Sequence, residues 1–152
     1  MIKLLDIRET FNDYKKSTLY LCGSICTLGC ADCFHQHLKK EHPTTLTKEE
    51  LLEKYIKTTS ADAILFSGLN WFEQIDELYT LIEFIRSSNI DKDIVIYTGF
   101  TKEEILDKIE KIKKFPNIIV KFGRYEQNLP SKYDSELGIT LASSNQYAEK
   151  IS

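Results

Sequence analysis

The sequence predicts an α/β fold, formed by one domain over residues 1–152, as either a partial (β/α) barrel or an open parallel sheet. Two observations carry this prediction. Short apolar runs alternate along the chain with amphipathic helical patterns, which is typical of parallel strands joined by crossover helices. A complete barrel of eight such units takes roughly 250 residues. A chain of 152 residues can therefore form only part of one.

Four apolar runs predict the strands. They are residues 18–22 (TLYLC), 62–67 (DAILFS), 93–98 (DIVIYT) and 118–122 (IIVKF). Gly68, Gly99 and Gly123 directly follow the last three runs. Because the functional face of such a sheet lies at the carboxyl ends of its strands, we expect these glycines and the segment after residue 22 at one edge.

Amphipathic patterns predict the intervening helices. The clearest is the apolar repeat that joins Trp71 to Ile85 at helical spacing. The two segments 47–50 and 101–104 both read TKEE, which is a capping-box pattern and marks the start of two further helices. Pro116 ends the last of these helices.

The composition excludes several classes of protein. Apolar residues make up 42% of the chain and charged residues 28%, as in ordinary globular proteins. The net charge of −3 argues against binding to nucleic acid. The beginning of the chain does not resemble a signal peptide, and no apolar run approaches the roughly 18 residues of a membrane span. We therefore expect a cytoplasmic protein with no membrane partner.

All four cysteines lie between residues 22 and 33. In a cytoplasmic protein, clustered cysteines indicate metal binding or catalysis rather than disulfides. The spacing Cys26-x3-Cys30-x2-Cys33 can wrap three corners of a cubic 4Fe–4S cluster. Because such clusters are usually held by four cysteines, three would leave one iron open to a substrate or cofactor.

Zinc is the main alternative ligand for these thiols. Cys30 and Cys33 could form half of a zinc site that His35 or His37 completes. Two observations disfavour it: no second Cys/His pair follows at the usual distance, and the spacing is not typical of zinc modules. Unligated thiols are a third possibility. Cys22, which ends a predicted strand, is interpreted as a small buried hydrophobe, and the two histidines as partly exposed polar residues.

The three-cysteine motif, placed after a strand at the start of a parallel α/β pattern, resembles that of the radical S-adenosylmethionine (SAM) superfamily. Within it, the chain is similar to the anaerobic ribonucleotide reductase activating proteins, which activate glycyl radical enzymes. Further similarities are an aromatic residue after the third cysteine and three short motifs. These are Phe34, Ser67-Gly68, Tyr97-Thr98-Gly99-Phe100 and Ser143-Ser144-Asn145-Gln146.

The chain departs from the family pattern at two strand ends. Leu69, Asn70 and Trp71 stand where the family has a second glycine, an acidic residue and a proline. In the superfamily this edge receives the amino group of SAM, which backbone carbonyls could still bind here. Phe122 stands before Gly123, where the family often has aspartate.

The resemblance implies a fold of the radical SAM type and an oxidoreductase. It implies reductive cleavage of SAM at a 4Fe–4S cluster and formation of a glycyl radical on an anaerobic ribonucleoside-triphosphate reductase, with an electron donor such as flavodoxin. The catalytic and metal-binding residues would be Cys26, Cys30 and Cys33. The cofactor-binding residues would be Phe34, Ser67, Gly68, Leu69, Asn70, Thr98, Gly99 and Asn145.

Simpler interpretations stay open for several of these residues. Gly68 and Gly99 could merely end strands, Trp71 could belong to the core or to a partner surface, and residues 143–146 could be only a turn. The alternative functions are a radical SAM enzyme that acts on another protein or peptide, and a non-catalytic iron–sulfur or zinc-binding module.

Overall fold

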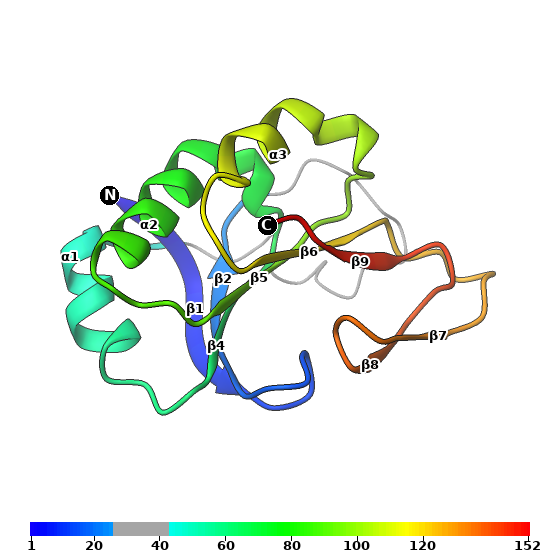
Figure 1. The fold of residues 1–152 in the computed structure, drawn as a ribbon, viewed down its shortest axis with the longest axis horizontal. Helices are drawn as coiled ribbons and strands as arrows, with labels where there is room; N and C mark the ends of the chain where they lie inside the picture. Colours follow the sequence, from blue (N-terminus) through cyan, green and yellow to red (C-terminus); the bar gives the residue numbers. More distant parts are fainter. Residues whose placement is uncertain (26–42) are drawn as a thin grey trace.

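A computed structural model describes residues 1–25 and 43–152 of the chain (Figure 1). In this part of the chain a seven-stranded sheet has the strand order β3-β1-β2-β4-β5-β6-β9, and β7 pairs with β8 in a separate hairpin. The strands are β1 (Ile2–Thr10), β2 (Thr18–Gly23), β3 (Thr44–Leu46), β4 (Ala63–Gly68), β5 (Asp93–Tyr97), β6 (Ile118–Phe122), β7 (Lys132–Asp134), β8 (Ile139–Leu141) and β9 (Tyr147–Lys150).

The sheet is mixed, with a parallel centre. Strands β2, β4, β5 and β6 pair in parallel, so their carboxyl ends meet at one edge, which we call the carboxyl edge. Strand β1 runs antiparallel to β2, and β9 runs antiparallel to β6. The four predicted apolar runs coincide with the four parallel strands to within one residue. The outer antiparallel strands were not predicted.

Helical segments connect the parallel strands and cover one face of the sheet (Figure 1). They are α1 (Lys48–Leu51), the π-helical turn η2 (Leu52–Ile56), the 3₁₀ turn η3 (Trp71–Gln74), α2 (Ile75–Ser87), the 3₁₀ turn η4 (Glu103–Ile105) and α3 (Leu106–Ile112). The predicted helix from Trp71 to Ile85 thus begins as a 3₁₀ turn and continues as α2. None of the helices in residues 1–25 and 43–152 has the length and apolar character that crossing a membrane requires.

Both TKEE segments form the expected caps. The backbone N–H of Glu50 donates to Thr47 Oγ1 at 3.0 Å, and that of Glu104 donates to Thr101 Oγ1 at 3.3 Å. In each case the glutamate carboxylate accepts a hydrogen bond from the threonine N–H in return. The predicted capping boxes are therefore present, and they fix where two of the crossover helices begin.

Alternate side chains of the central strands divide between two apolar layers. Ile64 and Phe66 of β4 face the helices, where a large cluster includes buried residues of α2 and α3. Leu65 of β4 faces the opposite side, with Tyr14 and Leu137 packed over it. This two-residue alternation is the geometry of a strand covered on both faces. The second face is thus covered by the segment before β2 and by the β7–β8 region.

Arg124, which follows β6, is joined to the start of the third crossover helix by a bidentate ion pair with Glu104, at 2.9 and 3.0 Å. The pKa of Glu104 is lowered from 4.5 to about 2, chiefly because its carboxylate is hydrogen-bonded to the Arg124 guanidinium. The ionised carboxylate therefore stabilises the fold at and above the unfolded-state pKa, and this contribution disappears as the pH falls toward 2.

We predict that Glu104→Gln lowers the melting temperature at neutral pH, and that the difference from wild type shrinks between about pH 4.5 and pH 2. Thermal unfolding monitored by circular dichroism across this range is the measurement. Glu103→Gln, one residue earlier, is the matched control for the loss of one surface charge. A Glu104→Gln deficit that does not depend on pH would contradict the ion pair as its cause.

Candidate functional site

The segment between β2 and β3, residues 24–43, contains Cys26, Cys30 and Cys33, and we call it the cysteine loop. Its two ends lie on either side of Leu4 in β1. Leu4 pairs with Gly23, at the end of β2, and with Thr44, at the start of β3. Because neighbouring strands are about 4.8 Å apart, the chain leaves and returns within about 10 Å. Cys26, Cys30, Cys33, Phe34, His35 and His37 lie outside the described residues, and their predicted roles stay predictions.

Gln74 of η3 holds the segment that enters the loop. Its Oε1 accepts hydrogen bonds from the N–H of Ser24 at 2.7 Å and from the Ser24 hydroxyl at 3.4 Å. Its Nε2 donates to the carbonyl of Lys3 and to the carboxylate of Glu77. No sequence motif singles out Gln74. The signal was a glutamine on the buried face of an amphipathic helix, three residues after Trp71.

Trp71 belongs to the core and supports the same segment. The side chain is fully buried, and its Nε1 donates to the carbonyl of Leu21 at 3.0 Å. A Cβ on Gly23 would lie 3.0 Å from the indole ring. The N–H of Leu69 donates to the carbonyl of Gly23 at 3.3 Å. Leu69 and Trp71, two of the residues that depart from the family pattern, thus position the entry to the cysteine loop.

Gly68 has a conformation and surroundings that require glycine. It lies at φ +85°, where side chains are strained. A Cβ there would lie 2.3 Å from Cys22 Sγ and 3.0 Å from Tyr20 Oη. Ser67, its neighbour, pairs with Cys22 across the parallel strands β2 and β4 and is itself buried. Gly68 does end β4, and the packing around Cys22 explains why a side chain is excluded there, whereas its predicted contact with a cofactor stays a prediction.

Cys22 is buried, as predicted, with 1% of its surface exposed. Burial raises the pKa of its thiol, although a hydrogen bond with Tyr20 opposes the shift. The thiol therefore stays protonated at neutral pH. Its burial in the apolar layer with Leu65 and Val95 agrees with the predicted role of a small core residue. The roles of Cys26, Cys30 and Cys33 as ligands stay predictions.

A line of hydrogen bonds crosses the carboxyl edge from the cysteine loop. The N–H of Asn70 donates to the carbonyl of Ile25 at 2.6 Å. Asn70 Oδ1 accepts from the hydroxyl of Thr98 at 2.9 Å. Thr98 Oγ1 in turn accepts from the N–H of Phe100 at 3.1 Å. Gly99 lies between Thr98 and Phe100. The predicted site residues after β4 and β5 are thus brought together with the entry to the loop.

The line continues to the C-terminal segment. The N–H of Gly123 donates to the carbonyl of Phe100 at 3.0 Å, and the carbonyl of Gly123 accepts from Gln146 Nε2 at 3.2 Å. Asn145 Nδ2 donates to the carbonyl of Arg124 at 2.7 Å. Residues 143–146 do form a turn, and its side chains bind the end of β6. We call the whole line the edge network; it comprises Ile25, Asn70, Thr98, Phe100, Gly123 and Gln146.

Two buried polar atoms of this region have no hydrogen-bond partner among the described residues. They are Asn70 Nδ2, a donor, and Asn145 Oδ1, an acceptor. Buried polar atoms in native proteins are nearly always paired. Asn70, which contacts Ile25 at the entry to the loop, and Asn145, at the end of β6, thus leave a free donor and a free acceptor along the carboxyl edge, as a polar ligand bound there would require.

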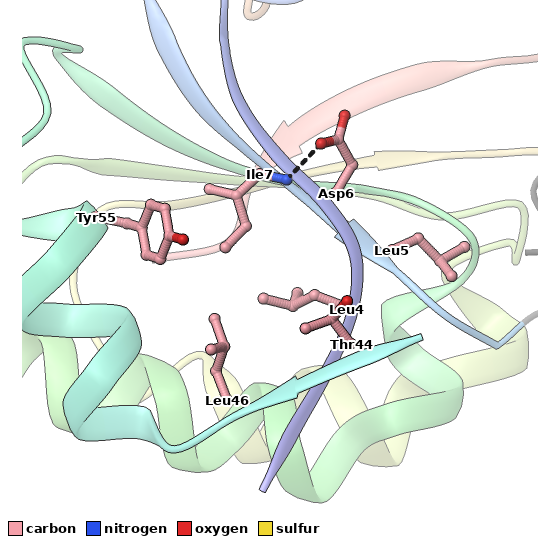
Figure 2. Close-up of a pocket in the computed structure, with 7 residues that line it drawn as sticks. All are labelled: Leu4, Leu5, Asp6, Ile7, Thr44, Leu46 and Tyr55. Atoms are coloured by element: carbon pink, nitrogen blue, oxygen red, sulfur yellow. Dashed lines mark hydrogen bonds between the residues drawn. The ribbon is translucent and has the colours of Figure 1, made fainter. Parts of the chain in front are cut away.

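A hollow of about 260 Å³ lies between β1, β3 and Tyr55, on the side of β1 away from β2 (Figure 2). It is lined by Leu4, Leu5, Asp6, Ile7, Thr44, Leu46 and Tyr55. The register of β1 shifts between Leu4 and Asp6, and β3 pairs with only the first residues of β1. The hollow thus marks the place where β1 loses its outer neighbour, and none of the predicted site residues lines it.

A family comparison indicates an iron–sulfur protein. The model of the 4Fe-4S single cluster domain family matches residues 15–148, and the chain belongs to this family. The expected 4Fe–4S cofactor is thus supported over zinc. Comparison with curated proteins and with solved structures gives no match.

We predict that Gly68→Ala destabilises the fold by about 2 kcal/mol or more, because it adds backbone strain and overpacking. Urea unfolding of the single and double variants is the measurement. Cys22→Ala removes the sulfur that the new Cβ would meet at 2.3 Å. The double variant should therefore lose less stability than the sum of the two single variants. Strict additivity would contradict the proposed clash.

We predict that Cys22→Ala, purified and reconstituted without oxygen, keeps a brown cluster with roughly four irons per chain, as in the wild type. Alanine at Cys26, Cys30 or Cys33 should lose the cluster, because each removes a predicted ligand. Iron and sulfide assays with the visible absorption spectrum are the measurement. A colourless wild type that contains stoichiometric zinc, or loss of iron in Cys22→Ala alone, would contradict the assignment.

Proposed function

We propose that this protein is a radical SAM activase that generates a glycyl radical on an anaerobic ribonucleoside-triphosphate reductase. The x3-x2 cysteine spacing and membership of the 4Fe-4S single cluster domain family support this proposal. The four parallel strands and their helices would correspond to the partial (β/α) barrel of the radical SAM type. An electron donor such as flavodoxin would supply the reducing equivalent.

The observation that carries the proposal is the edge network. It joins the entry of the cysteine loop, through Asn70 and Thr98, to Gly123 and the C-terminal turn. These segments are far apart in the sequence, and each was singled out by its resemblance to the activases. A cofactor that extends from an open iron across the carboxyl edge would contact them in this order.

The chain's own residues would bind and orient the ligands. A reduced 4Fe–4S cluster would supply the single electron that breaks a carbon–sulfur bond of SAM. Gln74 and Trp71 hold the strand end from which the cysteine loop departs. Gly68 keeps the backbone at the end of β4 free of a side chain. Asn70 and Asn145 present a free donor and a free acceptor at the same edge.

The test is to reduce the reconstituted protein with SAM and to assay 5′-deoxyadenosine, with and without a candidate reductase. We expect cleavage of SAM, and a glycyl radical signal in electron paramagnetic resonance only when the reductase is present. Cleavage without a radical on any reductase would favour another protein or peptide as the substrate. A protein that holds the cluster but never cleaves SAM would contradict the proposal and favour an electron carrier.

A further inference from the structure

Asn70 is the central residue of the carboxyl edge. It lies two residues after the end of β4 and caps the 3₁₀ turn η3, with its Oδ1 accepting from the N–H of Phe72 at 3.2 Å. Its own N–H donates to Ile25, the last described residue before Cys26. Only 4% of its surface is exposed. A buried amide is thus fixed between the cysteine loop and the end of β5.

The hydrogen bonds around Asn70 can run in one direction only. The N–H of Phe72 is a donor, so the amide atom facing it must be the oxygen. The N–H of Phe100 donates to Thr98 Oγ1, so the single proton of that hydroxyl is free to point to Asn70 Oδ1. A flipped amide would place its nitrogen against a backbone donor. The orientation of the Asn70 side chain is therefore set by two backbone N–H groups.

With these bonds made, Asn70 can only donate a further hydrogen bond, from Nδ2. Both hydrogen bonds to Oδ1 are made within the protein, whereas Nδ2 is buried and has no partner in the described part of the chain. The NH2 group can only donate. The group that completes it must therefore be an acceptor, and a cationic amino group is excluded from this contact.

An acidic residue, which the activase pattern has at this position, can only accept. We propose, on the basis of the function proposed above, that Asn70 Nδ2 donates to a carboxylate oxygen of a bound amino-acid-type ligand, here the methionine part of SAM. A carboxylate is the strongest acceptor that such a ligand offers. The amino group of the ligand must then bind elsewhere along the carboxyl edge. Asn70 thus donates a hydrogen bond to the ligand where an acidic residue would accept one.

Binding of SAM and of decarboxylated SAM to the reconstituted, unreduced protein tests this assignment. Isothermal titration calorimetry measures both affinities for the wild type, Asn70→Ser and Asn70→Asp. Asn70→Ser is the matched variant, because serine is also a good cap for η3 but lacks the Nδ2 donor. Its melting temperature checks that the cap is kept.

We expect Asn70→Ser to weaken SAM binding about tenfold and to leave decarboxylated SAM nearly unchanged. Asn70→Asp should weaken SAM binding further and favour the decarboxylated ligand, because like charges would face each other. Any other effect of removing the carboxylate is common to all three proteins and cancels in the ratio of affinities.

Two results would overturn the assignment while leaving the proposed function intact. One is an unchanged ratio of affinities in Asn70→Ser, and the other is tighter binding of SAM by Asn70→Asp. If the wild-type protein with its cluster binds neither ligand, the proposed function fails, and this assignment fails with it.

Discussion

The structure depends on one constraint: the chain that leads into the cysteine loop must be held rigidly before the loop begins. Hydrogen bonds from Leu69 and Asn70 to the backbone of Gly23 and Ile25 meet this constraint. Gln74 adds a partly buried bond from its side chain to the N–H of Ser24. Because ligands are effective only when their supporting shell is fixed, it matters that these contacts hold the chain up to Ile25, the residue before the first predicted ligand.

The carboxyl edge uses shape and hydrogen-bond direction more than side-chain charge. Gly68 and Gly123 lie in the left-handed region of backbone conformation, and Thr98 and Asn70 are neutral and buried. Such an edge suits a ligand that brings its own reactive group, since cofactors carry the difficult chemistry and the protein supplies position. The neutral amides also differ from an acidic site, because each amide offers a defined donor and a defined acceptor.

The sequence predicted the central strands because each is a short apolar run that ends near glycine. It also predicted both capping boxes and the burial of Cys22. It did not predict β1, in which charged and apolar residues share an irregular alternation around a bulge, or β3, β7 and β8, which are too short to carry a pattern. Gln74 and the direction of the bonds at Asn70 depend on contacts between distant segments, which no local pattern encodes. The roles of the three predicted ligands remain predictions.

The pairing of Leu4 with both Gly23 and Thr44 makes the first strand a clasp on the cysteine loop. Formation of β1 and binding of the cluster are therefore thermodynamically linked. Cluster binding stabilises β1 by the same free energy by which formation of β1 strengthens cluster binding. Fraying of the N-terminus and loss of iron become two readouts of one equilibrium. Oxidative loss of the cluster would then first destabilise the pairing of β1 at the beginning of the chain.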